Sequence, residues 1–157
     1  MRKELLIGVA VGLVVLGLAA SGVLWVNKGS HVVLEGSIQK ARTLALEESA
    51  SFLVLDFRVT NPSDYPFVVR EVKVIVDGVE GNVVADVDAK RLFEYYKEIG
   101  PKYNDSLKTR DKVGARQTVD RMVSARFELP EAKLKGRKSL VLRIEEVDGL
   151  VNELKLP

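Results

Sequence analysis

Hydrophobic positions follow three different patterns along the chain. Residues 5–27 carry no charge and are mostly apolar. From residue 31 onward, several stretches alternate apolar and polar residues, which is typical of β-strands that bury one face. Over residues 86–100 the apolar spacing changes to three and four, which is typical of a helix with one apolar face. The chain therefore predicts an apolar N-terminal helix, a β-rich region and one helix inserted within that region.

The alternating stretches predict about seven strands. In residues 51–60 the alternation places Phe57 inside and Asp56 and Arg58 in solvent, so this strand is expected to be half-buried. Arg121 interrupts the apolar face of residues 118–129, so it lies at the strand's edge or beside a β-bulge. The other strands are expected over residues 31–40 or 31–44, 68–77, 83–85, 139–147 and 150–156.

Tight turns are expected to join these strands. Asp77-Gly78 and Asp148-Gly149 are strong hairpin-turn pairs. Helical crossovers between parallel strands are absent from the pattern. The sequence therefore favours a mainly β fold, an antiparallel immunoglobulin-like or fibronectin-like sandwich.

Residues 86–100 form the expected helix. Asp86 or Asp88 is a candidate cap for its first turn, and Gly100-Pro101 ends it. Residues 103–114 are polar and loop-like, so helix and loop together form an insertion over residues 86–116. The apolar stripe consists of Ala89, Leu92, Phe93, Tyr96 and Ile99.

The N-terminal segment has the length of a membrane span. The 23 residues from Leu5 to Asn27 are uncharged, and at 1.5 Å per residue such a helix crosses a hydrocarbon core of roughly 30 Å. The alternative is a cleaved signal peptide, with the small residues 19–22 as the cleavage site. A retained anchor is favoured because the apolar stretch continues past these residues to Trp25.

The charges that flank this span predict its orientation. Arg2 and Lys3 precede it and only Lys28 follows closely, so the positive-inside rule places the N-terminus in the cytoplasm. The expected organisation is a cytoplasmic N-terminus and anchor (1–27), a linker (28–30) and an extracytoplasmic or periplasmic β-domain (31–157). The protein is thus expected in the cell (inner) membrane as a single-pass protein.

Small residues within the span are candidates for helix packing. Gly8 and Gly12 form a GxxxG motif, and Gly17 and Ser21 repeat the spacing. Such residues let a second helix approach closely in lipid. They predict contact with another membrane subunit or a homo-oligomer, although glycine is also common in membrane helices without any partner.

Composition excludes several classes of function. The chain has 24 basic and 22 acidic residues, a net charge of +2, so it lacks the basic surplus of nucleic-acid binders. It has no cysteine and one histidine, His31, so disulfides, thiolate metal sites and His-based catalytic groups are not expected. Phosphate-loop and dinucleotide motifs are also absent.

Carboxylate groups do not suggest catalysis or metal binding. Asp86-Val87-Asp88 resembles the start of a calcium loop, but Arg91 stands where such a loop requires glycine. Glu145 and Glu146 are neighbours on a strand and point to opposite faces, so the two carboxylates cannot readily act on one substrate. Both are expected to lie in solvent. No catalytic residue, metal ligand or cofactor is therefore predicted, and the protein is expected not to be an enzyme.

The insertion supplies the best candidates for partner contact. Residues 97–116 contain six basic and three acidic residues, close to three of the four tyrosines. Tyrosine beside basic residues suits a protein interface or a lipid headgroup surface. The candidates are Tyr95, Tyr103, Lys102, Lys108 and Arg110; the helix stripe itself is expected to pack on the β-domain.

One stretch carries a family resemblance. Residues 52–67, FLVLDFRVTNPSDYPF, form a strand that ends in an Asn-Pro turn, and a valine-rich strand follows to residue 78. Residues 52–78 resemble the type 2 late-embryogenesis-abundant family, also called the water stress and hypersensitive response domain. The resemblance implies an Ig-like or fibronectin-like sandwich without enzymatic activity, often behind an N-terminal membrane span.

Two functions remain open at this point. The first is an accessory subunit whose β-domain binds other membrane or envelope proteins. The second, which follows from the family resemblance, is a stand-alone stress-protective or ligand-binding module. An enzyme is the third and least supported class, since no catalytic constellation is present.

Overall fold

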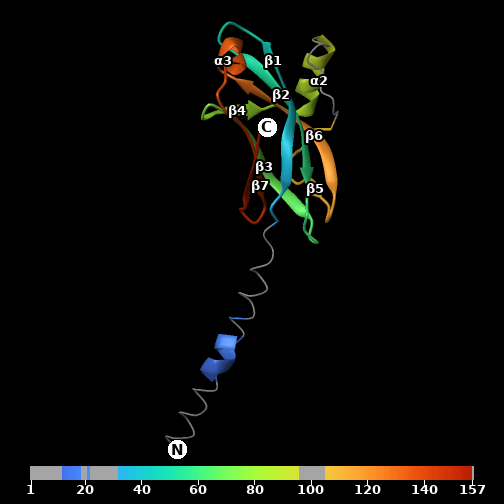
Figure 1. The fold of residues 1–157 in the computed structure, drawn as a ribbon, viewed down its shortest axis with the longest axis vertical. Helices are drawn as coiled ribbons and strands as arrows, with labels where there is room; N and C mark the ends of the chain where they lie inside the picture. Colours follow the sequence, from blue (N-terminus) through green and yellow to red (C-terminus); the bar gives the residue numbers. More distant parts are fainter. Residues whose placement is uncertain (1–11, 19–20, 22–31, 96–104, 157) are drawn as a thin grey trace, which may run out of the picture. The chain divides into compact units, whose positions relative to one another are not determined.

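The computed structural model describes residues 12–18, 21, 32–95 and 105–156 (Figure 1). The chain divides into two compact units, residues 1–31 and 32–157. In the first unit residues 12–18 are helical, and the Ser21 hydroxyl donates a hydrogen bond to the Gly17 carbonyl at 2.7 Å. Among the described residues, no helix has both the length and the apolar character needed to cross a bilayer. The remaining residues of the expected anchor lie outside the described ranges.

The second unit, here called the β unit, is mainly antiparallel β-structure, as expected. Every pairing between its named strands is antiparallel. Its eight strands are β1 (Glu35–Ala45), β2 (Ser51–Thr60), β3 (Phe67–Val76), β4 (Val79–Val83), β5 (Lys112–Val113), β6 (Thr118–Phe127), β7 (Leu140–Glu146) and β8 (Val151–Lys155). Two short helices accompany them, α2 (Asp86–Tyr95) and α3 (Glu131–Lys135).

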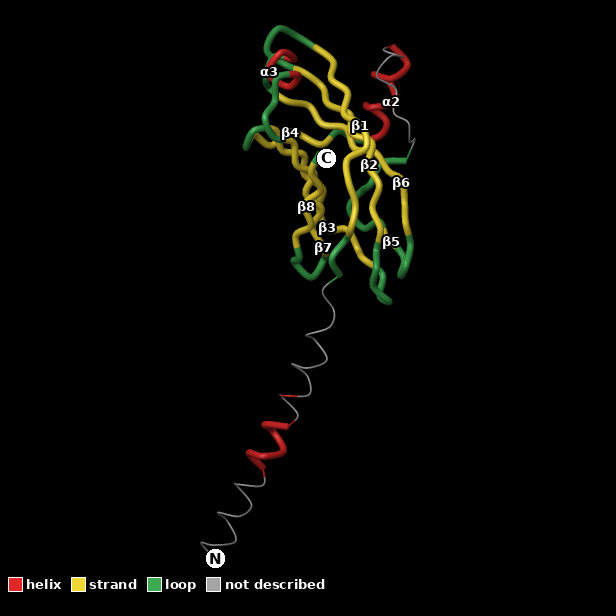
Figure 2. Tube along the Cα trace, in the orientation of Figure 1, coloured by secondary structure: helices red, strands yellow, loops and turns green. Residues whose placement is uncertain are grey.

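The strands form one sheet that folds back on itself. The order is β1-β2-β6-β4-β3-β7-β8, with β5 added to β3. β4 is the corner, because Gly81 pairs with β3 and the next residue, Asn82, pairs with β6. A Cβ at Gly81 would lie 2.5 Å from the Phe127 ring, so only glycine lets the strand turn this close to the core. At the open side, β1 and β8 contact each other, and the sheet is nearly closed (Figure 2).

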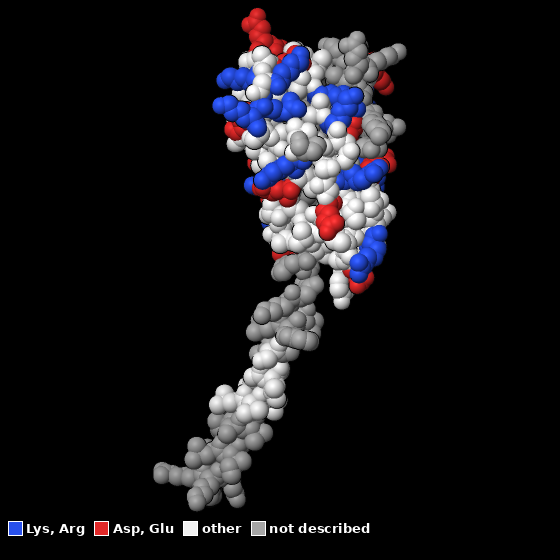
Figure 3. All heavy atoms as spheres, viewed as in Figure 1, with Lys and Arg blue, Asp and Glu red and all other residues white. Residues whose placement is uncertain are grey.

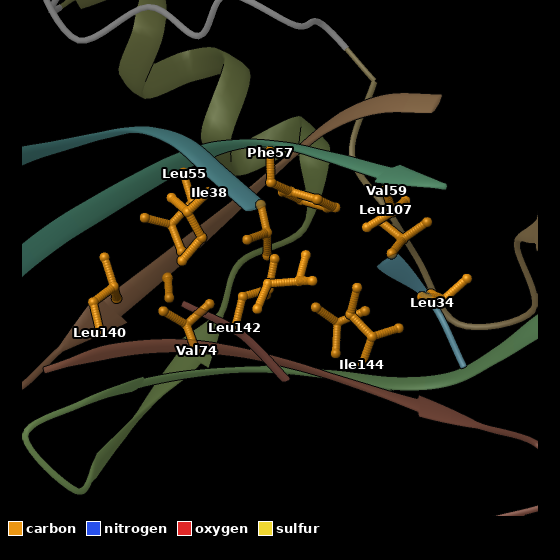
Figure 4. Close-up of a cluster of buried hydrophobic side chains, with 14 of the residues drawn as sticks. Leu34, Ile38, Leu55, Phe57, Val59, Val74, Leu107, Leu140, Leu142 and Ile144 are labelled. Carbon is orange, nitrogen blue, oxygen red and sulfur yellow. The ribbon is translucent and has the colours of Figure 1, made fainter. Parts of the chain in front are cut away.

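The inward faces of the two halves enclose the main core. Figure 4 shows side chains from β2, β3 and β7 meeting in the space between the two halves. Phe57, Val74 and Leu142 have no exposed surface. The predicted inward positions of residues 51–60, 68–77 and 139–147 are confirmed, because burial of alternate apolar residues is what fixes the register of each strand.

The expectation that residues 51–60 form a half-buried strand is wrong. Phe52 and Val54, on the outward face of β2, are buried in a second cluster that Ala89 and Phe93 of α2 cover. Asp56 on the same face is fully buried, and Arg42 donates to it at 2.5 Å. Both faces of β2 are therefore covered, since a helix that is distant in sequence packs on the outer one.

Two hairpin turns are confirmed. Asp77 and Gly78 have φ values of 48° and 84°, the left-handed conformations that a two-residue turn requires, and Gly149 has φ 91°. The Asp77 carboxylate accepts from the backbone N–H groups of Lys138 and Ser139 at 2.9 and 2.7 Å. The hydrogen bond from Ser139 is the main reason why the pKa of Asp77 is lowered.

Several local expectations need correction. Residues 130–138, for which the sequence pattern predicts neither a strand nor a helix, contain α3, and the loop of residues 103–114 contains β5. The pairing of β2 with β6 is continuous, so no bulge accompanies Arg121, which lies near the start of β6. Glu146 is buried rather than solvated.

The inserted helix starts where it is expected. Described α2 runs from Asp86 to Tyr95, and the expected continuation to residue 100 lies outside the described ranges. The residue before the helix is Ala85, whose carbonyl accepts from Asp88 N–H at 3.0 Å. Asp88 therefore lies within the first turn, where its carboxylate complements the helix dipole rather than capping the helix start.

Candidate functional site

An open cleft lies where β4 crosses from one half of the sheet to the other. It has a volume of about 560 Å³, within the usual range of ligand sites. β3 and β6 form two of its sides, the end of β4 forms the third, and residues 106–109 form the fourth. We call this site the β3–β6 cleft.

The cleft exists because β3 loses its neighbour on one edge. Its ladder with β4 ends at the Val74–Gly81 pair, and its bonds to β5 and the preceding loop resume at Val69. Between them, residues 70–73 pair with no strand on this edge within the described part of the chain. A short stretch of strand edge therefore faces the cleft, and such an edge is a template for pairing with another chain.

The lining is largely apolar, with one unsatisfied polar group. Val72, Leu107 and Val123 contribute buried core side chains to the wall. Ser124 is 1% exposed, and its hydroxyl has no hydrogen-bond partner among the described residues. A buried hydroxyl without a partner is costly, which distinguishes Ser124 from the other residues that line the cleft.

A braced loop places Lys108 in the wall of the cleft. Leu107 N–H donates to the Met122 carbonyl at 3.1 Å, and Met122 N–H donates to the Asp105 carbonyl at 3.0 Å. The Asp111 carboxylate accepts from Lys108 N–H at 2.8 Å and closes the turn. These bonds attach the loop to β6, so this side of the cleft is held in place.

The structure describes the side chains of only some of the predicted partner residues. Lys108 lines the cleft, and Arg110 is exposed on the adjacent turn with φ 71°. Arg110 N–H donates to the Val69 carbonyl at 2.7 Å, which holds this strained turn against β3. Tyr95 is the last residue of described α2, but its side chain, like Lys102 and Tyr103, lies outside the described part.

The small residues of the N-terminal segment are described only in part. Gly12 and Gly17 have open space where a Cβ would lie, and Gly8 is outside the described ranges. Packing of a second helix on Gly8, Gly12, Gly17 and Ser21 stays a prediction.

Asn61 of the Asn-Pro turn has a structural role. Its side chain is fully buried and donates to the carbonyls of Tyr65 and Val113 at 2.7 and 3.0 Å. Its side-chain oxygen, Oδ1, accepts hydrogen bonds from the backbone N–H and the hydroxyl of Ser63 at 3.0 and 2.8 Å. All its polar atoms are thus satisfied, and Asn61 ties the turn to β5 rather than presenting a group to a ligand.

No metal centre is found in the part of the chain that the structure describes, since no three His, Cys, Asp or Glu side chains gather there. His31 lies outside the described ranges. Searches for similar proteins found no matching family model, no matching curated protein and no matching solved structure.

Proposed function

We propose that this protein is a non-catalytic, single-pass membrane protein whose β unit binds a segment of another membrane or envelope protein. The observation that carries the proposal is the β3–β6 cleft, an apolar opening beside a short unpaired strand edge. An extended apolar segment suits both features, because its backbone can pair with a strand edge while its side chains fill a pocket. The protein would then act as an accessory subunit.

The topology supports the proposal of an immunoglobulin-like or fibronectin-like sandwich. β1, β2 and β6 form one layer and β3, β7 and β8 form the other, with β4 joining them. Two packed antiparallel layers with about seven main strands, some of whose connections cross between the layers, are the usual composition of such sandwiches. The small β5 and the helices are additions to this plan.

Residues 52–78 also support the proposed relation to the type 2 late-embryogenesis-abundant family. They form β2 in one layer, the Asn-Pro turn, and β3 in the opposite layer. The four hydrogen bonds of Asn61 give a physical reason for asparagine in this motif. The family relation remains a proposal.

The proposed location rests on the sequence of the N-terminal segment. Residues 5–27 have the length and apolar character of a span, and the preceding positive charges favour a cytoplasmic N-terminus. The β unit would then lie on the extracytoplasmic side of the cell membrane.

Co-purification from native membranes tests the accessory role. Val83 lines the cleft and is 44% exposed, whereas Val79 lies on the same strand, is 45% exposed and is outside the cleft. After extraction in mild detergent, the wild type should retain a stoichiometric partner. Val83→Glu should lose that partner and Val79→Glu should keep it. Purification of this chain alone, or equal loss in both variants, would contradict the proposal.

A second variant tests the membrane part separately. Replacing Gly8 and Gly12 by Ile adds bulk to the small-residue face. If this face contacts another span, the variant should weaken the complex while Val83→Glu acts independently. An unchanged complex would restrict the partner contact to the β unit.

The alternative is a stand-alone module that binds a small ligand. The unsatisfied hydroxyl of Ser124 favours it, because a mainly apolar ligand with one polar atom fits this lining. Native mass spectrometry of the full chain would then show a bound small molecule that Ser124→Ala removes. Serine-to-alanine exchange removes only the hydroxyl and adds no bulk to this buried position, so loss of the ligand would point to the hydroxyl.

A further inference from the structure

A second concave site lies at the end of the β unit that carries α3. It has a volume of about 520 Å³. Four cationic residues line it and no acidic residue does: Lys135, Arg137, Lys138 and Lys155. We call it the basic groove. Figure 3 shows Lys and Arg side chains gathered over this end of the β unit.

Most of these cations form no close ion pair within the described part of the β unit, although the Asp77 carboxylate interacts with the charge of Lys138 from beyond ion-pair distance. Lys135 pairs with Glu131 at 3.0 Å. In the described ranges, no carboxylate lies within ion-pair distance of Arg137, Lys138 or Lys155. The whole chain is nearly balanced, with 24 basic and 22 acidic residues, so the groove is a local concentration of charge rather than a reflection of composition.

Arg137 presents an unused donor. One of its terminal nitrogens, Nη1, donates to the Leu134 carbonyl at 2.7 Å, which holds the guanidinium in place. Its Nε is buried and has no hydrogen-bond partner within the described residues. A preorganised guanidinium with a free donor is suited to an anionic oxygen, since charge-assisted hydrogen bonds are the stronger kind.

Apart from Ser139, the remaining lining is apolar. Val141 is half-buried in the groove and Leu156 is 38% exposed at its side. A phosphate polymer or a sulfated sugar gains little from aliphatic walls, whereas a peptide that mixes acidic and apolar residues gains from both the charges and the walls. The groove's concave shape also suits a chain rather than a flat bilayer surface.

The groove lies at the end of the β unit away from Val32, where the chain enters it. β1 begins at Glu35 opposite Thr60 and ends at Ala45 opposite Ser51. The Thr43 hydroxyl, near that second end, donates to Glu131 of α3 at 3.0 Å. The basic groove therefore lies toward the Ala45 end of β1, opposite the end at which Glu35 stands.

We propose that the basic groove binds an acidic segment of a partner protein that also contains apolar residues. The cations attract and orient the carboxylates, Arg137 Nε donates a hydrogen bond to one of them, and Val141 and Leu156 contact the apolar side chains. This site is separate from the β3–β6 cleft and does not depend on the function proposed for it.

A binding measurement on the full chain in non-ionic detergent tests the site. The probe is a fluorescein-labelled peptide of alternating Glu and Leu residues, followed by fluorescence anisotropy. Lys138→Glu/Lys155→Glu should weaken binding by about tenfold or more, because both repulsion and lost attraction act on the peptide. Lys90→Glu/Lys112→Glu changes the net charge equally at exposed positions outside the groove and should change affinity by less than about threefold.

Additional ligands distinguish a peptide partner from other polyanions, and a cleft variant distinguishes the basic groove from the β3–β6 cleft. An all-Glu peptide, heparin, inorganic polyphosphate and anionic-lipid vesicles should each bind more weakly than the Glu-Leu peptide. Tighter binding of any of them, or equal loss in the two double variants, would overturn the proposal. Val83→Glu, which alters the cleft, should leave peptide binding unchanged; if it abolishes binding, the peptide uses the cleft and the groove proposal fails.

Discussion

The two faces of the β1-β2-β6 layer are stabilised in different ways. The inner face is apolar throughout its centre and meets the opposite layer in the main core. The outer face changes along β2, from Val54 beneath α2, through the buried Asp56, to the exposed Arg58. On the inner face, a residue contributes to the stability of the fold through apolar burial. On the outer face, its contribution depends on whether another part of the chain packs over it.

This difference predicts how much three neighbouring residues each contribute to the free energy of unfolding. Phe57, Asp56 and Arg58 occupy three successive positions on one strand. The first should act through apolar burial, the second through a buried ion pair and the third through an exposed ion pair. Substitutions at these positions measure the three contributions within the same strand.

The largest effect is expected on the inner face. Phe57 is fully buried in the main core, so Phe57→Ala should lower the free energy of unfolding by about 3–5 kcal/mol through lost burial and a cavity. Chemical denaturation of the full chain in detergent, followed by circular dichroism of the β-structure, measures this change. A loss below about 1 kcal/mol would mean that the two layers are not packed on each other as described.

The buried ion pair should come next. Asp56→Ala leaves the Arg42 guanidinium, 12% exposed, without its partner carboxylate, and we expect a loss of about 3 kcal/mol. Arg42 can still reach some water, which limits the cost. The double variant Asp56→Leu/Arg42→Met should recover part of the loss, because removing both charges leaves no buried charge unpaired. If the double variant were less stable than Asp56→Ala, the pair would not be the cause.

The sequence predicts burial that depends on local strand geometry, and it does not predict burial that depends on residues distant in the chain. Alternation within β2 identified the inner face, since strand geometry is local. It missed the burial of Val54, which depends on α2 packing over the strand, and the burial of Asp56, which pairs with Arg42 of the neighbouring strand β1. The burial of Glu146 and the helix α3 were also missed: Glu146 has no local signal of burial at the end of β7, and α3, with five residues, is too short to show a period.

The candidate site was predicted less well than the fold. Lys108 and Arg110 were chosen from local composition, and the structure places Lys108 in the cleft wall. Ser124 was not identified, since a serine in an alternating strand ordinarily faces solvent. The cleft results from the change of partners between Gly81 and Asn82 of β4, and the only local sign of that change is a glycine inside a strand.

The dependence of stability on pH tests the contribution of exposed carboxylates. The pKa of Asp77 is lowered by hydrogen bonds, chiefly from Ser139, and that of Asp64 by Arg116. A carboxylate with a lowered pKa stabilises the folded state above its unfolded pKa of about 3.9, and this contribution is lost as the pH falls through the folded value. Stability should therefore be constant near neutral pH and decrease below about pH 4.

Asp77→Asn tests this contribution directly. The amide cannot be deprotonated, so the variant should be less stable than the wild type at neutral pH and should approach it as the pH falls below about 4. Thermal unfolding at several pH values measures the difference, and Asp148→Asn, at the corresponding position of the other hairpin turn, is the control. A difference that stays constant with pH would assign the effect to turn geometry instead of charge.

The smallest effect is expected at the exposed end of the outer face. Arg58 donates to both carboxylate oxygens of Asp120, at 2.7 and 2.9 Å, but the two side chains are 54% and 30% exposed. A double-mutant cycle with Arg58→Ala and Asp120→Ala should give a coupling of about 0.2–1 kcal/mol, because water and salt screen exposed pairs. The coupling should fall further in 1 M salt. A value that matches the loss from Asp56→Ala would mean that the outer face is covered along its whole length, and the distinction between its two ends would not hold.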